Sequence, residues 1–461
     1  MKKYDVIIIG SGQAGNPLAM AMGQAGKKTL LIEKRLVGGT CVNDGCTPTK
    51  AMIGSGRIAW LASKSNDWGV HTGKVTSNLK AIKNRKDVIV ASFRKGNIKG
   101  LKDTPNVELL MGTAHFVDKK KIEILTDDGK KTQAHADLIF INTGTIPQIP
   151  AIDGLKDCPY LTSTQILDLV EIPKELIIVG AGYIALELGQ LYSRMGAKVT
   201  LLENGDVFLP KEDRDIAQSL YDILTEEGLT IELNAKINQV SQTKNKKITV
   251  SYRQSKQHKE LRGSHILIAA GRKAQTEQLN LSATGVKTAN NGFVKVNTKL
   301  ETNVKGIYAL GDVKGGPAFT HISYNDFVVV SRNLLANKNL SIRNRMVPYV
   351  VFTDPQLARI GITEKEAKDK KLNYKIAVLP MENVARGIEV GETRGMMKAI
   401  VDAKNNRILG AAIIGAEGGE IMSVLQMAMM GKISTETIRY GVFAHPTYAE
   451  SLMNLFMNFK N

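Results

Sequence analysis

Two cysteines separated by four residues are the clearest candidates for redox chemistry in this chain. Cys41 and Cys46 lie in the segment GGTCVNDGCTPTK, residues 38–50. Pro48 suits the first turn of a helix, so Cys46 is expected at the positive end of a helix dipole. Lys50 follows one turn later on the same face, where an ammonium group favours a thiolate. The segment predicts a thiol/disulfide pair with Cys46 as the stabilised thiolate and Cys41 as the more exposed thiol.

Two alternatives have the same spacing, namely a pair of reduced structural cysteines and half of a metal site. The sequence contains no second CxxC motif and no histidine cluster that would complete a zinc site. No metal site is therefore predicted. The third cysteine, Cys158 in the turn-like stretch DCPY, is expected to be inert.

The residues before the cysteines form a complete dinucleotide-binding unit. The apolar run YDVIIIG leads into Gly10-x-Gly12-x-x-Gly15, then an apolar helical segment, then a strand that ends at Glu33. Backbone N–H groups and the helix N-terminus of such a unit hold a pyrophosphate, and the carboxylate binds ribose hydroxyls. Because the cysteines belong to this unit, we expect it to bind FAD, whose isoalloxazine must contact the disulfide.

The same unit occurs a second time. ELIIVG leads into Gly180-x-Gly182, a helix and a strand ending at Glu203, which follows Gly180 by 23 positions, as Glu33 follows Gly10. Two such sites in one chain suit the transfer of a hydride between two cofactors. The second site is expected to bind a nicotinamide nucleotide.

Four motifs, in this order along the chain, resemble the class I pyridine nucleotide–disulfide oxidoreductases, which include glutathione reductase, dihydrolipoyl dehydrogenase and mercuric reductase. They are GGTCVNDGC with PTK, GAGYIALE at 180–187, GIYALGDV at 306–313 and HPTYAE at 445–450. The resemblance runs nearly end to end and is greatest to the mercuric-reductase-like branch. It implies an α/β fold with two Rossmann-like dinucleotide-binding domains, for FAD and NAD(P), and a C-terminal α+β dimerisation domain.

The resemblance also implies roles for single residues. Cys41 matches the family's interchange thiol and Cys46 its charge-transfer thiol. Lys50 and Glu187 match an ion pair beside the flavin N5, and Tyr183 matches the ring that covers the empty nicotinamide pocket.

A histidine and a glutamate near the C-terminus match the family's acid–base pair. His445 would exchange a proton with the interchange thiol, and Glu450 would orient its imidazole. In the family this histidine comes from the other subunit. The resemblance therefore implies a homodimer in which His445 is donated across the interface.

The expected cofactor-binding residues come from both dinucleotide units and from later motifs. Thr143-Gly144 match the family's ATG turn, although Asn142 stands where Ala is usual. The residues expected at FAD are Gly10, Gly12, Gly15, Glu33, Gly39, Thr40, Lys50, Thr143, Gly144, Gly311 and Asp312. Those expected at the nicotinamide nucleotide are Gly180, Gly182, Tyr183, Ile184, Glu203 and Gly271.

The residues of the second unit favour NADH over NADPH. The Glu203 carboxylate would accept a hydrogen bond from a free ribose 2′-OH and repel a 2′-phosphate. Asn204 also stands where NADPH-using relatives place an arginine. NADPH stays an alternative, because Ala185 is a substitution common in NADPH users and Lys211 or Arg214 could bind a phosphate.

The motifs also divide the chain. A length of 461 residues suits about three domains. We expect an FAD domain at 1–150 and 275–340, an NAD(P) domain at 151–274 and a dimerisation domain at 345–461. Residues 418–431, GGEIMSVLQMAMMG, are expected to form a helix whose methionines lie in the core or at the dimer interface.

The composition suggests a cytoplasmic protein. With three cysteines the chain is poor in potential structural disulfides, and no apolar stretch is long enough for a membrane span. The net charge of +18 comes from lysines spread along the chain, without a recognisable nucleic-acid fold. We interpret it as a solvated lysine-rich surface, with attraction of anionic cofactors or substrates as the alternative.

The favoured function is an NAD(P)H-dependent flavoprotein reductase that passes electrons through FAD and the Cys41–Cys46 disulfide to a disulfide or a metal ion. Dihydrolipoyl dehydrogenase would run the same path backward. Mercuric reductase is a second alternative, although no cysteine follows Cys158 and mercuric reductases usually have Tyr where His445 stands. A flavin-based redox sensor is the non-enzymatic alternative.

Overall fold

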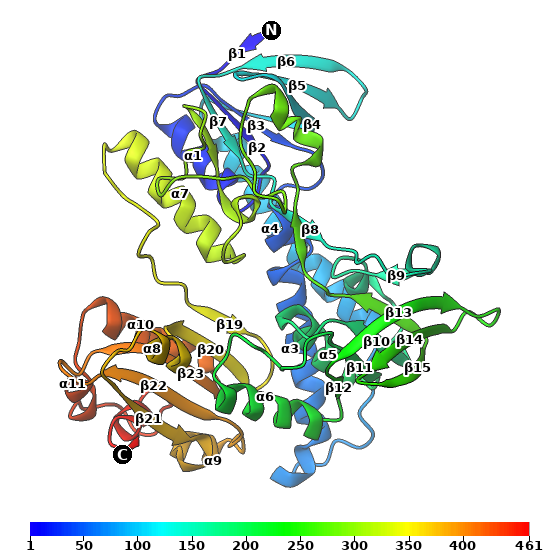
Figure 1. The fold of residues 1–461 in the computed structure, drawn as a ribbon, viewed down its shortest axis with the longest axis vertical. Coiled ribbons are helices and arrows are strands. Elements are labelled where there is room, and N and C mark those ends of the chain that lie inside the picture. Colours follow the sequence, from blue (N-terminus) through cyan, green and yellow to red (C-terminus); the bar gives the residue numbers. More distant parts are fainter. Residues whose placement is uncertain (461) are drawn as a thin grey trace.

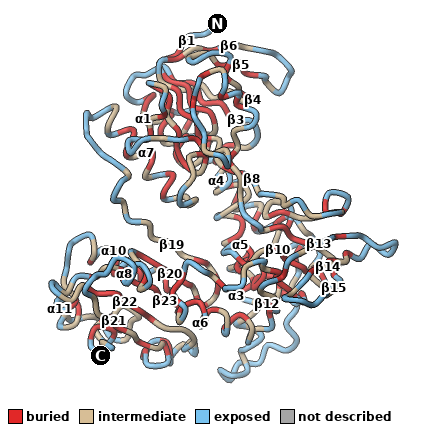
Figure 2. The backbone as a smooth tube through the Cα atoms, viewed as in Figure 1, coloured by how far each residue is buried: buried red, intermediate tan, exposed pale blue. Residues whose placement is uncertain are grey.

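Two sheets of the dinucleotide-binding type and a third, antiparallel sheet organise the chain in the computed structural model, which describes residues 1–460 (Figure 1). Figure 2 shows buried segments around each sheet, and one buried cluster continues from the second sheet into the C-terminal sheet through Leu357 and Ile414. The predicted α/β class, with two Rossmann-like units and a C-terminal α+β region, is confirmed. The exact domain boundaries stay a prediction.

The first sheet has eight strands in the order β1-β6-β5-β4-β3-β2-β7-β18. Its centre is parallel, and all four residues of β2 (Val6–Ile9) are buried, as expected for a strand covered on both faces. The late strand β18 (Ile307–Ala309) pairs with β7, so the chain returns to this sheet after forming the second one. The other elements are β1 (Lys2–Lys3), α1 (Gly15–Gln24), β3 (Thr29–Glu33), α2 (Gly39–Asn43), α3 (Cys46–Ser63), α4 (Leu79–Asp103), β4 (Val107–Asp118), β5 (Lys121–Thr126), β6 (Lys131–His135), β7 (Leu138–Ile141) and α7 (Thr320–Leu335).

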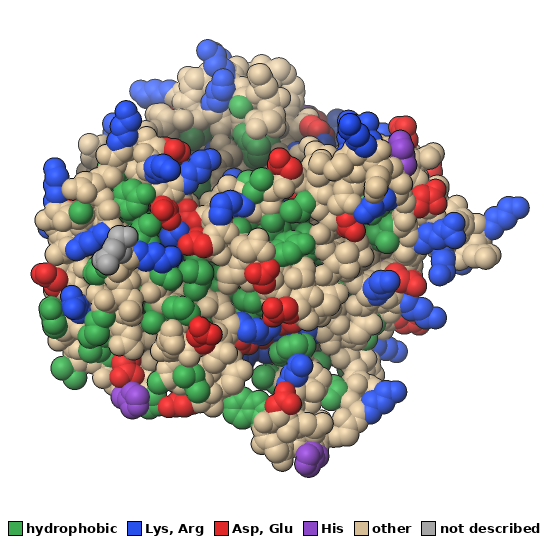
Figure 3. Space-filling model, turned by 60° about the horizontal axis from the view of Figure 1, so that its bottom comes forward, with side chains coloured by type: hydrophobic (Ala, Val, Ile, Leu, Met, Phe, Trp, Pro, Cys, Tyr) green, Lys and Arg blue, Asp and Glu red, His purple; other side chains and the backbone are tan. Residues whose placement is uncertain are grey.

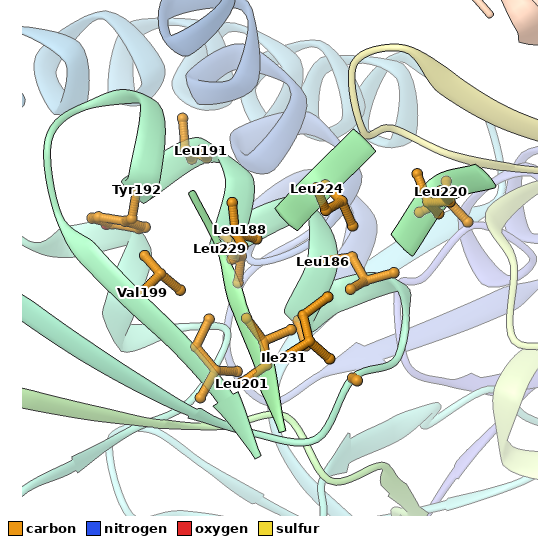
Figure 4. Close-up of a cluster of buried hydrophobic side chains, with 14 of the residues drawn as sticks. Leu186, Leu188, Leu191, Tyr192, Val199, Leu201, Leu220, Leu224, Leu229 and Ile231 are labelled. Atoms are coloured by element: carbon orange, nitrogen blue, oxygen red, sulfur yellow. The ribbon is translucent and has the colours of Figure 1, made fainter. Parts of the chain in front are cut away.

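The second sheet repeats the strand–helix–strand design of the first. Its order is β12-β11-β10-β16-β9, and β10 (Glu175–Val179) pairs in parallel with both β11 and β16. Side chains of α5, β11 and α6 form its buried core, seen in Figure 4. The elements of this part are β9 (Tyr160–Leu161), α5 (Tyr183–Arg194), β11 (Lys198–Leu202), α6 (Arg214–Glu226), β12 (Thr230–Glu232), β16 (His265–Ile268) and a separate antiparallel sheet of β13 (Ala235–Gln242), β14 (Ile248–Gln254) and β15 (Gln257–Gly263).

A pair of strands and a long helix connect these parts. The chain leaves the first sheet through β8 (Thr145–Pro147) and comes back through β17 (Arg272–Ala274), and the two strands pair with each other. The long helix α3 starts beside the first sheet and packs against α4 and α5 (Figure 1). Helix α3 therefore connects the cysteine segment, at its N-terminus, to helix α5 of the second sheet.

The C-terminal sheet has the order β19-β20-β23-β22-β21-β24, with antiparallel neighbours throughout. Helix α10 (Gly418–Met430) is the predicted methionine-rich helix. Its Met422 is buried in the core, whereas Met427 and Met430 are exposed in the single chain. The other elements are β19 (Tyr349–Val351), β20 (Gln356–Gly361), α8 (Glu364–Asp369), β21 (Tyr374–Pro380), α9 (Ala385–Glu389), β22 (Met396–Asp402), β23 (Ile408–Gly415), α11 (Thr435–Arg439), α12 (Ser451–Leu455) and β24 (Phe459–Lys460).

Buried ion pairs join the C-terminal sheet to the second sheet. Arg194 of α5 lies 2.7 Å from Glu227 and 2.6 Å from Asp354, which precedes β20. Arg359 of β20 donates to Glu212 at 2.6 Å. Removing one member of such a buried pair costs about 3–5 kcal/mol, because the other charge is left buried and unpaired. These contacts fix the orientation of the two parts around the site described below.

The surface carries the net positive charge without a single basic patch on the face shown in Figure 3, where Lys and Arg side chains are interspersed with Asp and Glu. Within residues 1–460, no helix combines the length and the apolar character that crossing a bilayer requires.

Candidate active site

The cysteine pair lies where two helices meet. Cys41 is in the short helix α2, and α3 begins at Cys46, as predicted, with Gly45 as its N-cap. The Cys46 Sγ is 3.3 Å from the Oγ1 of Thr320, the first residue of α7. Cys46 therefore lies at the N-terminal ends of two helices, a setting that stabilises a thiolate.

The two thiols have opposite pKa shifts. A hydrogen bond from Cys41 is the largest cause that lowers the pKa of Cys46 to about 6, against the effect of burial; Thr320 and Lys50 lower it further. The pKa of Cys41 is raised well above its usual value, first by its hydrogen bond to Cys46 and then by burial. At neutral pH the pair thus carries one negative charge, on Cys46.

In the single chain the two thiols are exposed in the order opposite to the one expected, because Cys46 faces the cavity that fits FAD. Cys46 is exposed and Cys41 is only partly exposed. The physical reason is that both sulfurs face a cavity of about 590 Å³, and Cys46, at the start of α3, stands at its wall. Helix-dipole arguments place Cys46 correctly but do not say how wide the space in front of it is.

Two side chains between the cysteines fix the loop. The Asn43 amide donates to the carbonyls of Leu36, Val37 and Gly39, and its oxygen accepts a hydrogen bond of 2.8 Å from Arg94 of α4. The next residue, Asp44, pairs with Arg35. The sequence reasoning missed these roles, because Arg94 is far from the loop in sequence.

The Lys50–Glu187 ion pair connects helix α3, which starts beside the first sheet, to helix α5 of the second sheet. The Lys50 Nζ is 2.6 Å from Glu187 Oε2, and the glutamate is buried. The other Glu187 oxygen accepts the N–H of Phe352 at 2.9 Å, and the Phe352 ring lies 4.7 Å from the Lys50 Nζ. Residues from all three parts of the chain therefore converge beside Cys46.

The first glycine turn is closely packed. A Cβ on Gly15 would lie 2.7 Å from the Asn142 amide nitrogen, and Gly10 has a φ of +103°. Asn142 donates to the Gly10 carbonyl at 3.0 Å. Asparagine at the position where Ala is usual thus braces the turn from the end of β7.

The Glu33 carboxylate oxygens accept the N–H groups of Ser11 and Arg35, both at 2.9 Å.

The residues around the 590 Å³ cavity fit FAD. Helix α1 has no side-chain cap, so its first N–H groups are available to a pyrophosphate, and the Thr143 hydroxyl is buried without a partner within residues 1–460. Burial raises the pKa of Asp312. Every residue predicted at FAD lines the cavity except Gly15, which packs beneath the turn; the lining residues are Gly10, Gly12, Glu33, Gly39, Thr40, Lys50, Thr143, Gly144, Gly311 and Asp312.

A second cavity of about 780 Å³ lies at the second glycine turn. The Glu203 carboxylate accepts the N–H groups of Ala181 and Gly205, both at 2.8 Å. Arg214 donates to three backbone carbonyls and does not line this cavity, nor does Lys211. All the residues predicted at the nicotinamide nucleotide line it, namely Gly180, Gly182, Tyr183, Ile184, Glu203 and Gly271.

Tyr183 and Arg272 lie between the two cavities and line both. Burial raises the pKa of Tyr183 to about 12, so its phenol stays neutral. Arg272 donates to the side chain and the carbonyl of Thr145, both at 2.8 Å. The sequence reasoning named Gly271 but missed Arg272. Arg272 could have been recognised as a cationic residue directly after the glycine that follows the buried strand β16.

His445 and Glu450 form the predicted pair but lie away from the cysteines of their own chain. The His445 Nδ1 is 2.9 Å from a Glu450 oxygen. The imidazole is 66% exposed and does not line the cysteine cavity. Within residues 1–460, no three His, Cys, Asp or Glu side chains gather in a way that could hold a metal ion.

Two family models cover most of the chain. Residues 4–326 match the pyridine nucleotide-disulphide oxidoreductase model, and residues 347–456 match the dimerisation domain of the same family. The chain belongs to this family. Pyridine nucleotide-disulphide oxidoreductases of this type are FAD-dependent and use NAD(P)H, and the dimerisation domain indicates a homodimer.

Relatives of known name cover the chain nearly end to end. A probable pyridine nucleotide-disulfide oxidoreductase, RclA of Escherichia coli, is 36% identical over 460 residues, 99% of both chains. A mercuric reductase of Staphylococcus aureus is 34% identical over 97% of this chain and 81% of its own. A dihydrolipoyl dehydrogenase of Bacillus subtilis is 32% identical over 97% of this chain and 95% of its own.

Solved structures agree with these relatives. The Cu(II) complex of the HOCl-induced flavoprotein disulfide reductase RclA from Escherichia coli superposes with a TM-score of 0.91, at 34% identity and 99% coverage of both chains. The expectation of an FAD-dependent flavoprotein oxidoreductase that acts on sulfur groups or metal ions is confirmed.

Proposed function

We propose that this pyridine nucleotide-disulphide oxidoreductase is an NADH-dependent reductase in which Cys41 and Cys46 pass electrons to a disulfide or a metal-ion acceptor. The observation that carries the proposal is the Cys46 sulfur, with a pKa of about 6, at the wall of a cavity shared with the Lys50–Glu187 pair and Tyr183. Bound FAD would supply two-electron transfer between the nicotinamide and the thiol pair.

The cysteines divide the work according to their charge. Cys46 keeps the negative charge beside Lys50, and Glu187 holds the ammonium group in place. Cys41 attacks an acceptor disulfide, so that one acceptor thiol leaves and a mixed disulfide forms. Cys46 then attacks Cys41, which releases the second acceptor thiol and closes the Cys41–Cys46 disulfide.

His445 of one subunit serves the cysteines of the other. Its Nδ1 is held by Glu450, which leaves Nε2 to take the proton from Cys41 and give it to the leaving thiol. Three observations support this role: the exposure of the imidazole, its absence from its own chain's cysteine cavity, and the family's dimerisation domain. The homodimer is then the catalytic unit.

NADH is the proposed nucleotide. The Glu203 carboxylate stands at the nucleotide cavity with lone pairs available for a ribose 2′-OH, and its charge opposes a 2′-phosphate. Neither Lys211 nor Arg214 lines the cavity, which weakens the case for NADPH. A different lysine, Lys236, lines the nucleotide cavity.

Two classes of acceptor have support. A solved RclA structure is titled a Cu(II) complex and other relatives are named mercuric reductases, which favours a metal ion. A named dihydrolipoyl dehydrogenase at 32% identity and the paired His445–Glu450 favour a dithiol/disulfide exchanged in either direction. We further propose the cytoplasm as the compartment, since there a disulfide acts as a working part.

A reduction experiment tests the proposal. The purified holoenzyme is reduced without oxygen by NADH or NADPH, then reoxidised in parallel with lipoamide, glutathione disulfide, Hg(II), Cu(II) and oxygen. We expect faster reduction by NADH, a long-wavelength thiolate-to-flavin band at two-electron reduction, and rapid reoxidation by one acceptor class. Faster reduction by NADPH, or reoxidation by oxygen alone, would contradict the nucleotide or the acceptor assignment respectively.

A further inference from the structure

Tyr183 lies next to an aromatic stack formed by Phe319, His321 and Tyr349. The Phe319 ring is parallel to Tyr349, with centroids 5.6 Å apart and an interplanar angle of 7°, and parallel to His321 at 5.4 Å and 10°. Tyr183 meets the same ring at 6.2 Å and 42°. Phe319 thus has three aromatic neighbours, of which His321 and Tyr349 are parallel to it and Tyr183 is tilted.

The stack is anchored to a buried ion pair. The Tyr349 hydroxyl donates to Glu212, whose other oxygen accepts from Arg359 at 2.6 Å. Glu212 and Arg359 are both buried. Tyr349 and Phe319 are therefore held in place by contacts between the second and the C-terminal sheets.

Tyr183 is the member of the stack that has the fewest restraints. Its side chain has no hydrogen-bond partner within residues 1–460, and the residue is 37% exposed. It lines both cavities, so any rotation away from Phe319 changes access to the nucleotide cavity.

We propose that Phe319 is a positioning residue that holds the Tyr183 ring closed over the nicotinamide part of the nucleotide cavity and so sets the affinity for the nucleotide. This inference rests on the lid role assigned to Tyr183 by family resemblance. If a nucleotide binds only the open form, its apparent dissociation constant equals the intrinsic constant divided by the fraction of protein that is open. Aromatic contacts of this kind shift such an equilibrium by about 2- to 12-fold.

The test measures binding as well as turnover. The dissociation constant of NAD⁺, which does not reduce FAD, is measured by calorimetry for the oxidised holoenzyme and for Phe319→Leu, Tyr349→Phe and Phe319→Tyr. We expect Phe319→Leu to tighten NAD⁺ binding by about 2- to 12-fold. Tyr349→Phe keeps the ring but loses the hydrogen bond to Glu212, so it should tighten NAD⁺ binding less than Phe319→Leu does. Phe319→Tyr keeps an aromatic ring and should have the wild-type dissociation constant.

Kinetics separate positioning from damage. KM for NADH should fall in Phe319→Leu, whereas the thiolate band of dithionite-reduced enzyme should not change. Phe327→Leu removes a ring from helix α7, which begins directly after Phe319; Phe327 lines neither cavity, so this variant serves as the control. If Phe319→Leu does not retain FAD, the Tyr349→Phe result alone decides.

A double-mutant cycle distinguishes this inference from the lid role itself. Tyr183→Ala should tighten NAD⁺ binding, and Phe319→Leu should add nothing in that background. An unchanged dissociation constant in Tyr183→Ala would refute the lid role. A change in Tyr183→Ala together with none in Phe319→Leu would refute only the role of Phe319.

Discussion

The two dinucleotide units share one backbone design but differ in how tightly the glycine turn is packed. In both units the glutamate after the second strand's apolar run, Glu33 or Glu203, accepts two backbone N–H groups. One comes from the glycine turn and the other from the residue two positions after the glutamate. The first turn is braced by Asn142, which a Cβ on Gly12 would meet at 3.1 Å. In the second turn Gly180 is packed against the Ala269 carbonyl, which a Cβ would meet at 2.6 Å, whereas Gly182 has nothing within 4 Å. The second glycine of the motif is thus closely packed where we propose a resident FAD, and open where we propose a nucleotide that binds and leaves.

The reacting thiolate belongs to the closely packed unit alone, so Cys46→Ser should have the largest effect. Turnover with any acceptor should fall at least about 1,000-fold, because the oxidised disulfide cannot form. FAD content should stay unchanged because serine nearly keeps the size of cysteine at the cavity wall, and NAD⁺ affinity should stay unchanged because Cys46 does not line the nucleotide cavity. Stopped-flow reduction and steady-state assays check this, and catalysis that survives the change would remove the cysteine pair from the mechanism.

Adding a methyl group to each turn compares the packing directly. Gly12→Ala, at the position that matches Gly182, places a Cβ 3.1 Å from the Asn142 amide nitrogen and should cost about 1–3 kcal/mol, seen as lost FAD and a lower Tm. Gly182→Ala should leave Tm unchanged, since its φ of −76° suits any residue and nothing lies within 4 Å.

Gly182→Ala should nevertheless raise KM for the nucleotide, because the pyrophosphate approaches the backbone of this turn closely. Thermal denaturation and flavin release distinguish the two variants. Equal losses of stability in both would contradict the difference in packing.

Replacing the second glutamate should change nucleotide choice by a smaller factor. Glu203→Gln keeps the side chain's size but removes the charge that opposes a 2′-phosphate, so the preference for NADH over NADPH should shrink by about 10-fold. The ratio of kcat/KM values measures it. Glu33→Gln in the first unit is the matched control and should leave that ratio as it is.

The smallest expected effect concerns the pKa of Cys46. Lys50 lowers this pKa, so Lys50→Met should raise it, and the thiolate band should then appear at a higher pH than in the wild type. Thr320→Val should act in the same direction, because the Thr320 hydroxyl also lowers the pKa. Spectral titration of the two-electron-reduced enzyme measures both shifts. A lowered pKa in either variant would contradict the assigned cause.

Local sequence patterns predicted the parts of the site that depend on neighbouring residues. The helix start at Cys46 follows from Pro48, and the two glutamate-terminated units follow from glycine spacing. Contacts between distant segments were not predictable in this way. The bond from the Phe352 N–H to Glu187 and the aromatic stack on Phe319 depend on how the C-terminal sheet docks.

The exposure of the cysteines shows the same limit. Residue types suggested that Cys41 would be the more exposed thiol, whereas Cys46 is. Exposure depends on the shape of a cavity whose walls come from residues as far apart as Gly10 and Phe352. No local pattern encodes that shape.

The central claim is that Cys46, and not Cys41, carries the thiolate beside the flavin. The most direct measurement is the absorption spectrum of oxidised Cys41→Ser and Cys46→Ser holoenzymes between about pH 5 and pH 9. Our account predicts a long-wavelength band in Cys41→Ser that appears as the pH rises through the pKa of Cys46, and no such band in Cys46→Ser. A band in Cys46→Ser and none in Cys41→Ser would reverse the two roles and contradict the account.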